Sequence, residues 1–545
     1  MSTLDWIVFG LYLVVLLGVG VLAGKRHRGE AGFLLAGRSM PWWAVGLSVM
    51  ATQASAITFL GTTAQGATDG MRFAQFYLGL PIAMLILAFT LVPKLRAAKV
   101  TTVYELLEQR FDVRVRLATS VLFLVSRSLA LGVVVYAPSL VLSLMMGWDT
   151  SSAILLVTVV AVAYTLLGGL AAVIWTDVLQ MGLLLGGLAL CVPELLSRLP
   201  EGMALGEAWD LATLSGRTRV LDLSFDPSEK YTLWSGLFGG TLVFLAYFGC
   251  DQSQAQRLLA ARSLGHARRA LALNGVAKIP LQLGILAVGV LLFVVGHYEP
   301  PELFLDPRTP DVLVETGQVA RGAELEAEWD AAQSERRAAA DAWRAAPDDP
   351  VAQAAYRASQ TRVDSVTAAA GELQAGDLTN PLFLDFLLRA LPFGLLGLVL
   401  AAVCAAAMSS MDSELNALAT STAVDLYERH APGDVSEASV VRVSRWATLG
   451  WGVAAAVVAL YADQLGSVIE AVNQLGSYAY GSLLGVFTLA LGVPSARARG
   501  AFWGLLIGLA VVLIAGSQGL AWLWLNPLGA GVVIAVGWLD GRRAR

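Results

Sequence analysis

The chain contains 545 residues, of which 56% are hydrophobic and 14% are charged, and its mean hydropathy is +0.65. Soluble domains carry about 25% charged residues, so this composition excludes an ordinary soluble protein and predicts an all-α polytopic membrane protein. The net charge of −5 indicates no class of partner, because the charges fall between apolar runs. We expect the lipid bilayer, and no nucleic acid, as a partner.

Runs of about 20 apolar residues are typical of helices that span a bilayer. The first run begins at Asp5 without a basic region before it, so we expect it to be retained and not cleaved as a signal peptide. We count thirteen runs, at residues 5–24, 42–68, 73–97, 115–147, 151–167, 170–195, 232–259, 268–297, 392–427, 440–462, 467–493, 499–516 and 521–540.

Lysine and arginine concentrate in alternate short loops, which is typical of the cytoplasmic side of a membrane protein. The basic loops lie within residues 25–28, 94–116, 257–269, 429–445, 497–499 and 542–545. This pattern predicts an N-terminus outside and a cytoplasmic C-terminus. We expect a multi-pass protein of the inner (plasma) membrane.

Residues 300–379 interrupt the apolar pattern with a polar segment rich in Ala, Glu, Arg and Asp. Helix-forming residues dominate 320–345 and 350–372, and the Pro-containing stretch 345–350 indicates a turn. We predict a helical hairpin on the outer face, either a tolerated insertion or a partner-binding or gating module. The chain then divides into 1–299 (transmembrane helices 1–8), 300–379 and 380–545 (transmembrane helices 9–13).

A single carboxylate, Asp177, lies in the apolar run 168–181. An ionised side chain in a membrane helix is costly and marks a functional site by default. A cation is the simplest compensating group. Either Asp177 acts on a bound cation through its charge, or it is paired with a cationic side chain.

Two spans carry small and hydroxylated residues at mid-depth. The second span has such a patch at 51–58, and the ninth has the adjacent serines Ser409 and Ser410. Hard cations prefer oxygen ligands, and unwound helix segments in transporters expose carbonyl oxygens to ions. Close helix packing and interhelical hydrogen bonding explain the same residues without an ion, and both interpretations stay open.

The seventh span has a second candidate break, where Gly249 precedes a polar stretch that begins at Asp251. Lys278, in the next span, either pairs with Asp251 or meets a solute, and Arg127 in the fourth span has a similar ambiguity. The second and seventh spans, both interrupted, lie five spans apart. They would therefore be equivalent members of two five-helix repeats. This pattern is typical of an inverted-repeat transporter whose site lies between the repeats.

Several motifs together resemble the sodium/solute symporter family, which includes sugar, proline, pantothenate and sialic acid transporters. The matching stretches are 33–43, 168–177, 251–257 and 409–412. The resemblance covers the whole chain except 300–379. It implies a leucine-transporter-like core of 5+5 inverted repeats, with one helix before it and two after it.

The resemblance also implies a sodium site between the second and ninth spans. The matching ligands are the carbonyl groups of Ala51, Ala54 and Ala406 and the hydroxyls of Ser409 and Ser410, with Asp177 nearby. Members that bind two sodium ions carry a serine where this chain has Ala406. We therefore expect one Na+, with two as the alternative.

The solute site departs from the family's sugar transporters. Their glutamine and glutamate side chains are replaced by Thr58 and Tyr77, and an asparagine by Phe244, whereas Tyr247 and Lys278 match. The resulting pocket is less polar than a hexose site. We expect a solute site formed by Thr58, Phe76, Tyr77, Phe244, Tyr247, Phe248, Asp251 and Lys278.

We expect a monomeric, sodium-coupled secondary active symporter that imports a small organic solute, such as a sugar, carboxylate or vitamin, by alternating access. A transporter-like receptor without transport is the main alternative. A polytopic membrane enzyme would need a nucleophile with its base, or metal ligands, inside the membrane. All four histidines fall at span ends or in loops, so we expect no enzyme.

Overall fold

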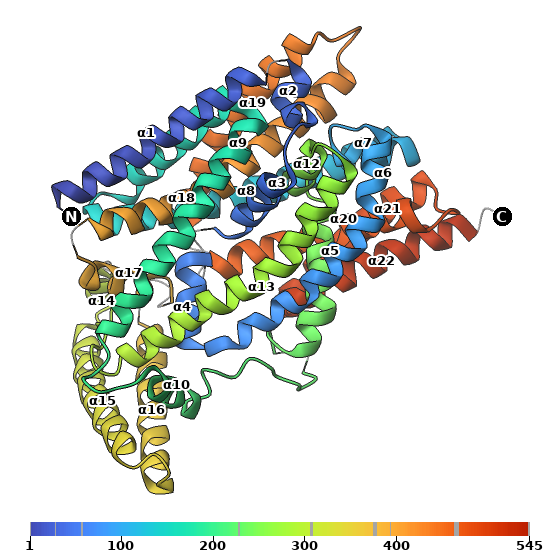
Figure 1. Ribbon diagram of the computed structural model, residues 1–545. Coiled ribbons are helices and arrows are strands. Elements are labelled where there is room, and N and C mark those ends of the chain that lie inside the picture. Colours follow the sequence, from blue (N-terminus) through green and yellow to red (C-terminus); the bar gives the residue numbers. More distant parts are fainter. Residues whose placement is uncertain are drawn as a thin grey trace.

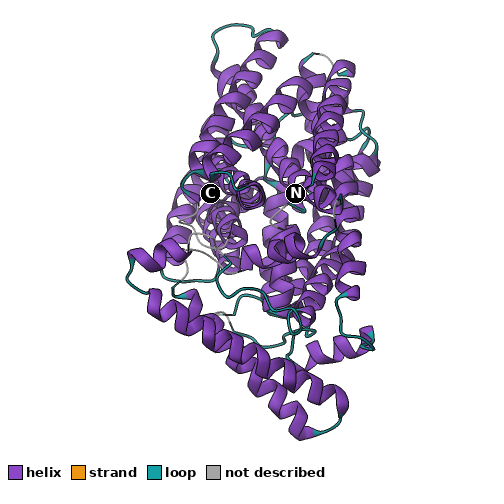
Figure 2. Ribbon diagram, turned by 90° about the vertical axis from the view of Figure 1, so that its left-hand side faces the viewer, coloured by secondary structure: helices purple, strands orange, loops and turns teal. Residues whose placement is uncertain are grey.

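The computed structural model describes residues 2–27, 29–55, 58–226, 229–305, 309–373, 379–392, 394–462 and 468–542. These residues form helices and connecting loops, and no β-strand occurs among them (Figures 1 and 2). Most helices form one elongated bundle, and a pair of helices, α15 and α16, projects from one end of it (Figure 1). The prediction of an all-α polytopic architecture is confirmed.

The first half of the chain runs from the N-terminus to α10. Its helices are α1 (Thr3–Arg26), α2 (Glu30–Leu35), η1 (Ala36–Arg38), α3 (Trp42–Gln53), η2 (Thr58–Thr62), α4 (Thr63–Thr68), η3 (Gly70–Gly79), α5 (Leu80–Phe89), α6 (Leu91–Ala98), α7 (Val103–Arg110), α8 (Val113–Met146), α9 (Thr150–Ser197) and α10 (Leu205–Leu214).

The second half contains the projecting pair and the C-terminal helices. Its helices are η4 (Ser235–Gly240), α11 (Thr241–Gly249), α12 (Gln252–Ala260), α13 (Leu264–Val295), α14 (Thr309–Glu315), α15 (Val319–Ala345), α16 (Pro350–Gly371), α17 (Thr379–Ala390), α18 (Leu395–Ser421), η5 (Thr422–Glu428), α19 (Glu437–Ala459), α20 (Val468–Gly492), α21 (Ala498–Ser517) and α22 (Trp522–Arg542).

Nine helices of the described ranges are long and apolar enough to cross a membrane, or ten if the bent pair of α3 and η2–α4 is one span. α9 alone contains two predicted spans, because its 48 residues bend at Gly169, where φ is 57° and ψ is −157°. A Cβ there would lie 2.4 Å from the Phe33 carbonyl oxygen, so glycine suits both the backbone angle and the close approach. The count of thirteen spans stays a prediction.

Both candidate breaks separate helices at the expected places. The axes of α3 and η2–α4 differ by 68°, and residues 56 and 57 between them lie outside the described ranges. α11 ends at Gly249, and α12 begins at Gln252 with the Asp251 carboxylate accepting a hydrogen bond from the Ser253 amide at 2.8 Å. This side chain caps the new helix at its N-terminus.

The core of the bundle is centred on α18, nearly all of whose residues are buried. α1, α3, α8, α9 and α19 pack around it. Asp5, in the first turn of α1, accepts hydrogen bonds from the backbone amides of Gly394 and Gly397 at 2.7 and 2.8 Å. A carboxylate at the N-terminus of a helix is stabilising, so Asp5 joins the starts of α1 and α18.

The pair α15–α16 has a small apolar core of its own. The side chains of Leu325, Trp329, Val363 and Val366 meet between the two helices. Residues 346–349 connect them, and Asp349 caps α16 by accepting a hydrogen bond from the Val351 amide at 2.9 Å. We call α15 and α16 the hairpin. Its position on the outer face stays a prediction, as do the division of the chain at 299/300 and 379/380.

Candidate functional site

Asp177, on the second arm of α9, lies against α3 and α12. Ser48 donates a hydrogen bond to its Oδ2 at 2.5 Å, and Arg257 Nη2 lies 3.3 Å from the same oxygen. Neither the Asp177 nor the Arg257 side chain has exposed surface. Asp177 Oδ1 has no hydrogen-bond partner among the described residues. The structure therefore pairs Asp177 with a cationic side chain and leaves one carboxylate oxygen free.

Arg257 belongs to this cluster and not to a basic surface loop, which corrects its sequence assignment. Every residue of α12 is buried, because the helix packs among α3, α11 and α18. Arg257 Nε donates to Ser48 Oγ at 2.7 Å, and Nη2 also donates to Ser413 Oγ. The polar residues that follow the break at Gly249 therefore lie in the interior of the bundle and not in a surface loop.

A second buried carboxylate, Asp412 on α18, lies close to the first. Its oxygens accept hydrogen bonds from the hydroxyls of Tyr164, Thr176 and Ser413 at 3.0, 3.3 and 3.1 Å. No cationic side chain pairs with Asp412 in the described part of the chain. Arg257 therefore pairs with Asp177 and reaches Asp412 only through Ser413, whose hydroxyl accepts from Arg257 and donates to Asp412. Sequence reasoning missed Asp412, although an acidic residue within the apolar run 392–427 is the signal that identified Asp177.

The predicted sodium ligands come from two helices that meet in the structure. Ser410, on α18, donates a hydrogen bond to the carbonyl oxygen of Thr52 at 2.9 Å, near the end of α3. Ser409 lies 3.5 Å from the carbonyl oxygen of Ala406 on the same helix. Ala51, Ala54 and Ala406 are buried at this junction. Hydroxyl and carbonyl oxygens are suitable ligands for a hard cation such as Na+, and their binding of sodium stays a prediction.

A cavity of about 120 Å³ lies beside this junction. Five of the predicted solute residues line it, Thr58, Phe76, Tyr77, Phe244 and Tyr247. Phe248, Asp251 and Lys278 are buried but do not form its wall. The other lining residues are Thr52, Gln53, Ser55, Phe73, Arg127, Val134, Val243, Ser410, Glu414, Val472, Asn473, Ser477, Tyr480 and Trp522.

Arg127, on α8, is the cationic group of the cavity wall. It forms ion pairs with Asp251 and, at 3.1 Å, with Glu414, and it lies 5.2 and 5.1 Å from the ring centres of Tyr247 and Tyr480. The ion pairs and the cation–π contacts hold the guanidinium next to these two tyrosine rings. Arg127 takes the ion-pairing role with Asp251 that was considered for Lys278.

Four polar atoms on the cavity residues lack hydrogen-bond partners within the described ranges. They are the donors Arg127 Nη2 and Trp522 Nε1 and the acceptors Gln53 Oε1 and Glu414 Oε2. An unsatisfied buried polar group costs about 1–3 kcal/mol. A solute that offers an acceptor to Arg127 and a donor to Glu414 or Gln53 would remove this cost.

Lys278, on α13, lies next to Tyr77 but does not line the cavity. Its Nζ is 5.6 Å from the ring centre of Tyr77 and has no hydrogen-bond partner in the described residues. Of the two roles considered for Lys278, the described residues do not show the pairing with Asp251, which Arg127 contacts instead. Lys278 contributes a buried positive charge next to a residue of the cavity wall.

Comparisons with known proteins show what the chain is similar to. Residues 33–298 and 361–508 match the model of the sodium:solute symporter family. The chain is 31% identical over 518 residues to the sodium-dependent multivitamin transporter of Oryctolagus cuniculus, covering 93% of this chain and 69% of that protein. It is 27% identical over 508 residues to the human sodium-coupled monocarboxylate transporter 2, covering 93% of this chain and 71% of that protein.

Another relative and one solved structure extend the comparison. The human sodium/iodide cotransporter is 27% identical over 516 residues, covering 93% of this chain and 69% of that protein. The substrate-bound, outward-open structure of a Na+-coupled sialic acid symporter has a TM-score of 0.79 at 23% identity, covering 99% of this chain and 98% of that one. This likeness shows a shared fold.

Proposed function

The chain belongs to the sodium:solute symporter family and is a multi-pass, sodium-coupled symporter, and we propose that the solute it imports is a small organic carboxylate. The family resemblance and the leucine-transporter-like fold expected from the sequence are confirmed. The proposal includes the predicted orientation, with the N-terminus outside the plasma membrane and the C-terminus in the cytoplasm. It also includes a monomeric protein without catalytic activity.

The observation that carries the proposed solute class is the free Nη2 of Arg127 at the cavity. A guanidinium binds a carboxylate through charge-assisted hydrogen bonds, which are stronger than neutral ones. Glu414 Oε2 and Gln53 Oε1 would accept hydrogen bonds from a hydroxyl or amine on the same solute. The cavity volume of about 120 Å³ is below the range of about 300–1,000 Å³ that drug-sized ligands occupy, which favours a small solute.

Charge balance supports the coupling to sodium. Arg127 and Lys278 match Asp251 and Glu414 in number, so a carboxylate that enters the cavity adds an uncompensated negative charge. Ser410 lines the cavity and also contacts the end of α3. A sodium ion bound there would neutralise the solute at close range, where the low dielectric of the interior makes the attraction strong.

One sodium ion is proposed, held by Ala51, Ala54, Ala406, Ser409 and Ser410. Arg257 pairs with Asp177 and leaves the buried Asp412 beside this place without a cationic partner in the described residues, so the region favours an added cation. Asp177 is paired with Arg257, and its Oδ1 has no hydrogen-bond partner in the described residues. A second ion at Asp177 is the alternative.

The proposal is tested by uptake into proteoliposomes under an inward sodium gradient. Labelled hydroxy- and amino-carboxylates are compared with neutral sugars and with the corresponding amides. We expect sodium-dependent uptake of carboxylates. Sodium-dependent uptake of neutral sugars, with none of any carboxylate, would refute the proposed solute class.

The ion site is tested in the same assay with Ser409→Ala and Ser410→Ala. Each change removes one hydroxyl ligand, and we expect the half-saturating sodium concentration to rise about tenfold, equivalent to about 1.4 kcal/mol. Ser444→Ala is the matched control, because Ser444 is also buried in a helix but its hydroxyl has no hydrogen-bond partner among the described residues. Unchanged sodium dependence in the double variant would refute the ion site.

A further inference from the structure

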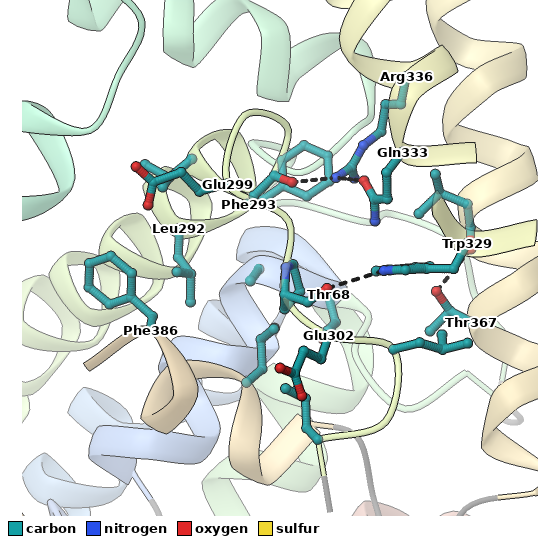
Figure 3. Close-up of a pocket in the computed structure, with 18 of the residues that line it drawn as sticks. Thr68, Leu292, Phe293, Glu299, Glu302, Trp329, Gln333, Arg336, Thr367 and Phe386 are labelled. Carbon is teal, nitrogen blue, oxygen red and sulfur yellow. Dashed lines mark hydrogen bonds between the residues drawn. The ribbon is translucent and has the colours of Figure 1, made fainter. Parts of the chain in front are cut away.

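A second cavity, of about 260 Å³, lies between the hairpin and the end of the bundle. Figure 3 shows the end of α13 on one side of it and α15 and α16 on the other. It shares no residue with the central cavity. Its walls include the apolar side chains of Leu292, Phe293, Trp329, Val363 and Phe386.

Arg336 brings a buried positive charge from α15 into this cavity. Its Nη2 donates to the carbonyl oxygen of Gly296 at 2.7 Å and to Gln333 Oε1 at 2.5 Å, and its Nη1 lies 3.3 Å from Gln360 Oε1. No carboxylate pairs with Arg336 among the described residues. Burial lowers the pKa of Arg336 to about 10, so the guanidinium keeps its proton at neutral pH.

Three buried donors at this cavity have no hydrogen-bond partner in the described ranges. They are Arg336 Nε, Arg217 Nε and Gln333 Nε2. The hydrogen bond that Gln333 Oε1 accepts from Arg336 fixes the orientation of the amide, so its nitrogen is the free end. All three residues line the cavity. Three unsatisfied donors at one place are costly without an acceptor.

The two arginines lie over the same aromatic ring. Arg217 and Arg336 are 5.1 and 5.9 Å from the ring centre of Phe293. Four arginines and three carboxylates line the cavity in total, Arg198, Arg217, Arg336, Arg389, Glu299, Glu302 and Asp364. Glu299 is paired with Arg198 at 2.6 Å, and Asp364 lies 3.6 Å from Arg217. Arg389 is paired with Asp385, which lies outside the wall. Arg336 and Glu302 are therefore the two charged wall residues without an ion pair among the described residues.

We infer that this hairpin cavity binds a small organic carboxylate with an apolar body, at a site separate from the central cavity. The carboxylate would accept hydrogen bonds from Gln333 and the two arginines, and its hydrocarbon part would lie against Phe293, Trp329 and Phe386. The inference rests on these contacts alone and stands whether or not the solute class proposed for the central cavity is right.

Calorimetric titration of the purified full-length protein with benzoate tests the site, with neutral benzamide as the comparison ligand. Choline chloride replaces sodium chloride, because binding at the central site is expected to require sodium. We expect saturable benzoate binding without sodium and at least tenfold weaker binding of benzamide. Equal affinity for the two ligands, or no benzoate binding, would overturn the inference.

Gln333→Glu places a carboxylate where the free amide nitrogen lies and keeps an acceptor for Arg336. We expect it to weaken benzoate binding at least tenfold through charge repulsion. Gln318→Glu is the matched control, since Gln318 is exposed at the start of the same helix, and it should bind benzoate as the unaltered protein does. Equal affinity in the Gln333 variant and the control would also overturn the inference.

Tryptophan fluorescence locates the site independently of that variant's folding. Trp329 lines the cavity, and its indole N–H donates to the carbonyl oxygen of Pro301 at 3.1 Å. Benzoate should change the fluorescence of the unaltered protein in a saturable way. Most of this change should be lost in Trp329→Phe. A full change in that variant would place the ligand elsewhere and refute the assignment.

Discussion

Arg257 on α12 and Asp177 on α9 form an ion pair in which neither side chain is exposed, with Nη2 3.3 Å from Oδ2. Ser48, on α3, bridges them by accepting from Arg257 and donating to Asp177. Burying two charges costs several kcal/mol per ion, and attraction offsets this only when both partners are present. The pair therefore joins three helices and makes each charge dependent on the other.

Asp177→Asn should lower the free energy of unfolding by about 3–5 kcal/mol, because Arg257 remains buried without a paired charge. Of the two roles that the sequence left open, the pairing with a cationic side chain predicts this loss. Thermal unfolding of the purified protein measures it.

The double variant Asp177→Asn, Arg257→Met should recover part of this loss, since neither charge is then left alone. Asp348→Asn, at an exposed position in the turn of the hairpin, controls for the loss of a carboxylate in general. An Asp177→Asn variant as stable as the unaltered protein would contradict the importance of the pair.

Lys278→Met should stabilise the protein and impair transport. Its ammonium group is buried without a hydrogen-bond partner in the described residues, and removing such a group should gain about 1–3 kcal/mol. Solute uptake should fall, because the positive charge near Tyr77 is lost from the charge balance of the cavity. Melting temperature and uptake are measured in parallel.

Lys25→Met serves as the control, because Lys25 is exposed in the last turn of α1. It should change neither quantity. A Lys278→Met variant that melts earlier than the unaltered protein would indicate an ion pair that the described residues do not contain.

His297, just after α13, should make stability fall in acid. Burial, with a smaller effect of Arg336, holds the pKa of His297 well below its ordinary value of 6.5. Its ring nitrogens lie 2.9 Å from the Phe293 carbonyl oxygen and 2.8 Å from the Tyr356 hydroxyl. The unfolded chain binds a proton near pH 6.5 and the folded one does not, so stability decreases as pH falls below about 6.5.

This contribution reaches about 1.4 kcal/mol per pH unit. Melting temperatures at about pH 7.5 and about pH 5.5 should therefore differ more for the unaltered protein than for His297→Gln. The comparison cancels the contributions of other groups, including Arg217 and Arg336. Equal shifts in the two proteins would show that His297 is protonated in the folded state.

Deleting residues 309–375, with a short Gly/Ser bridge, should leave sodium-dependent uptake largely intact, because the proposed ion and solute sites lie in other segments. Stability should fall, since Tyr356 and Arg336 of the hairpin bond to His297 and to the Gly296 carbonyl of the bundle. Uptake and melting temperature are both measured.

A deletion variant that folds and binds sodium without transporting would show instead that the hairpin gates the outer vestibule. Limited proteolysis from each side of the membrane tests the orientation. Cleavage of the hairpin only from the cytoplasmic side would overturn the predicted topology.

The sequence by itself was sufficient for the helical architecture, the family and five residues of the cavity wall. Apolar runs of spanning length, Asp177 within one of them and the paired serines are local signals, readable in a window of about 20 residues. Eight residues are expected at the solute site from the family resemblance. Five of them, from Thr58 to Tyr247, line the cavity.

Only the tertiary structure decided which charges are paired. Asp177 meets Arg257, and Arg127 meets Asp251 and Glu414, from positions 80 to 287 residues apart. Local composition does not encode such pairings, because each depends on how separate helices pack. The same reason applies to the free donors of the hairpin cavity, because that cavity forms where α15 packs against the end of α13.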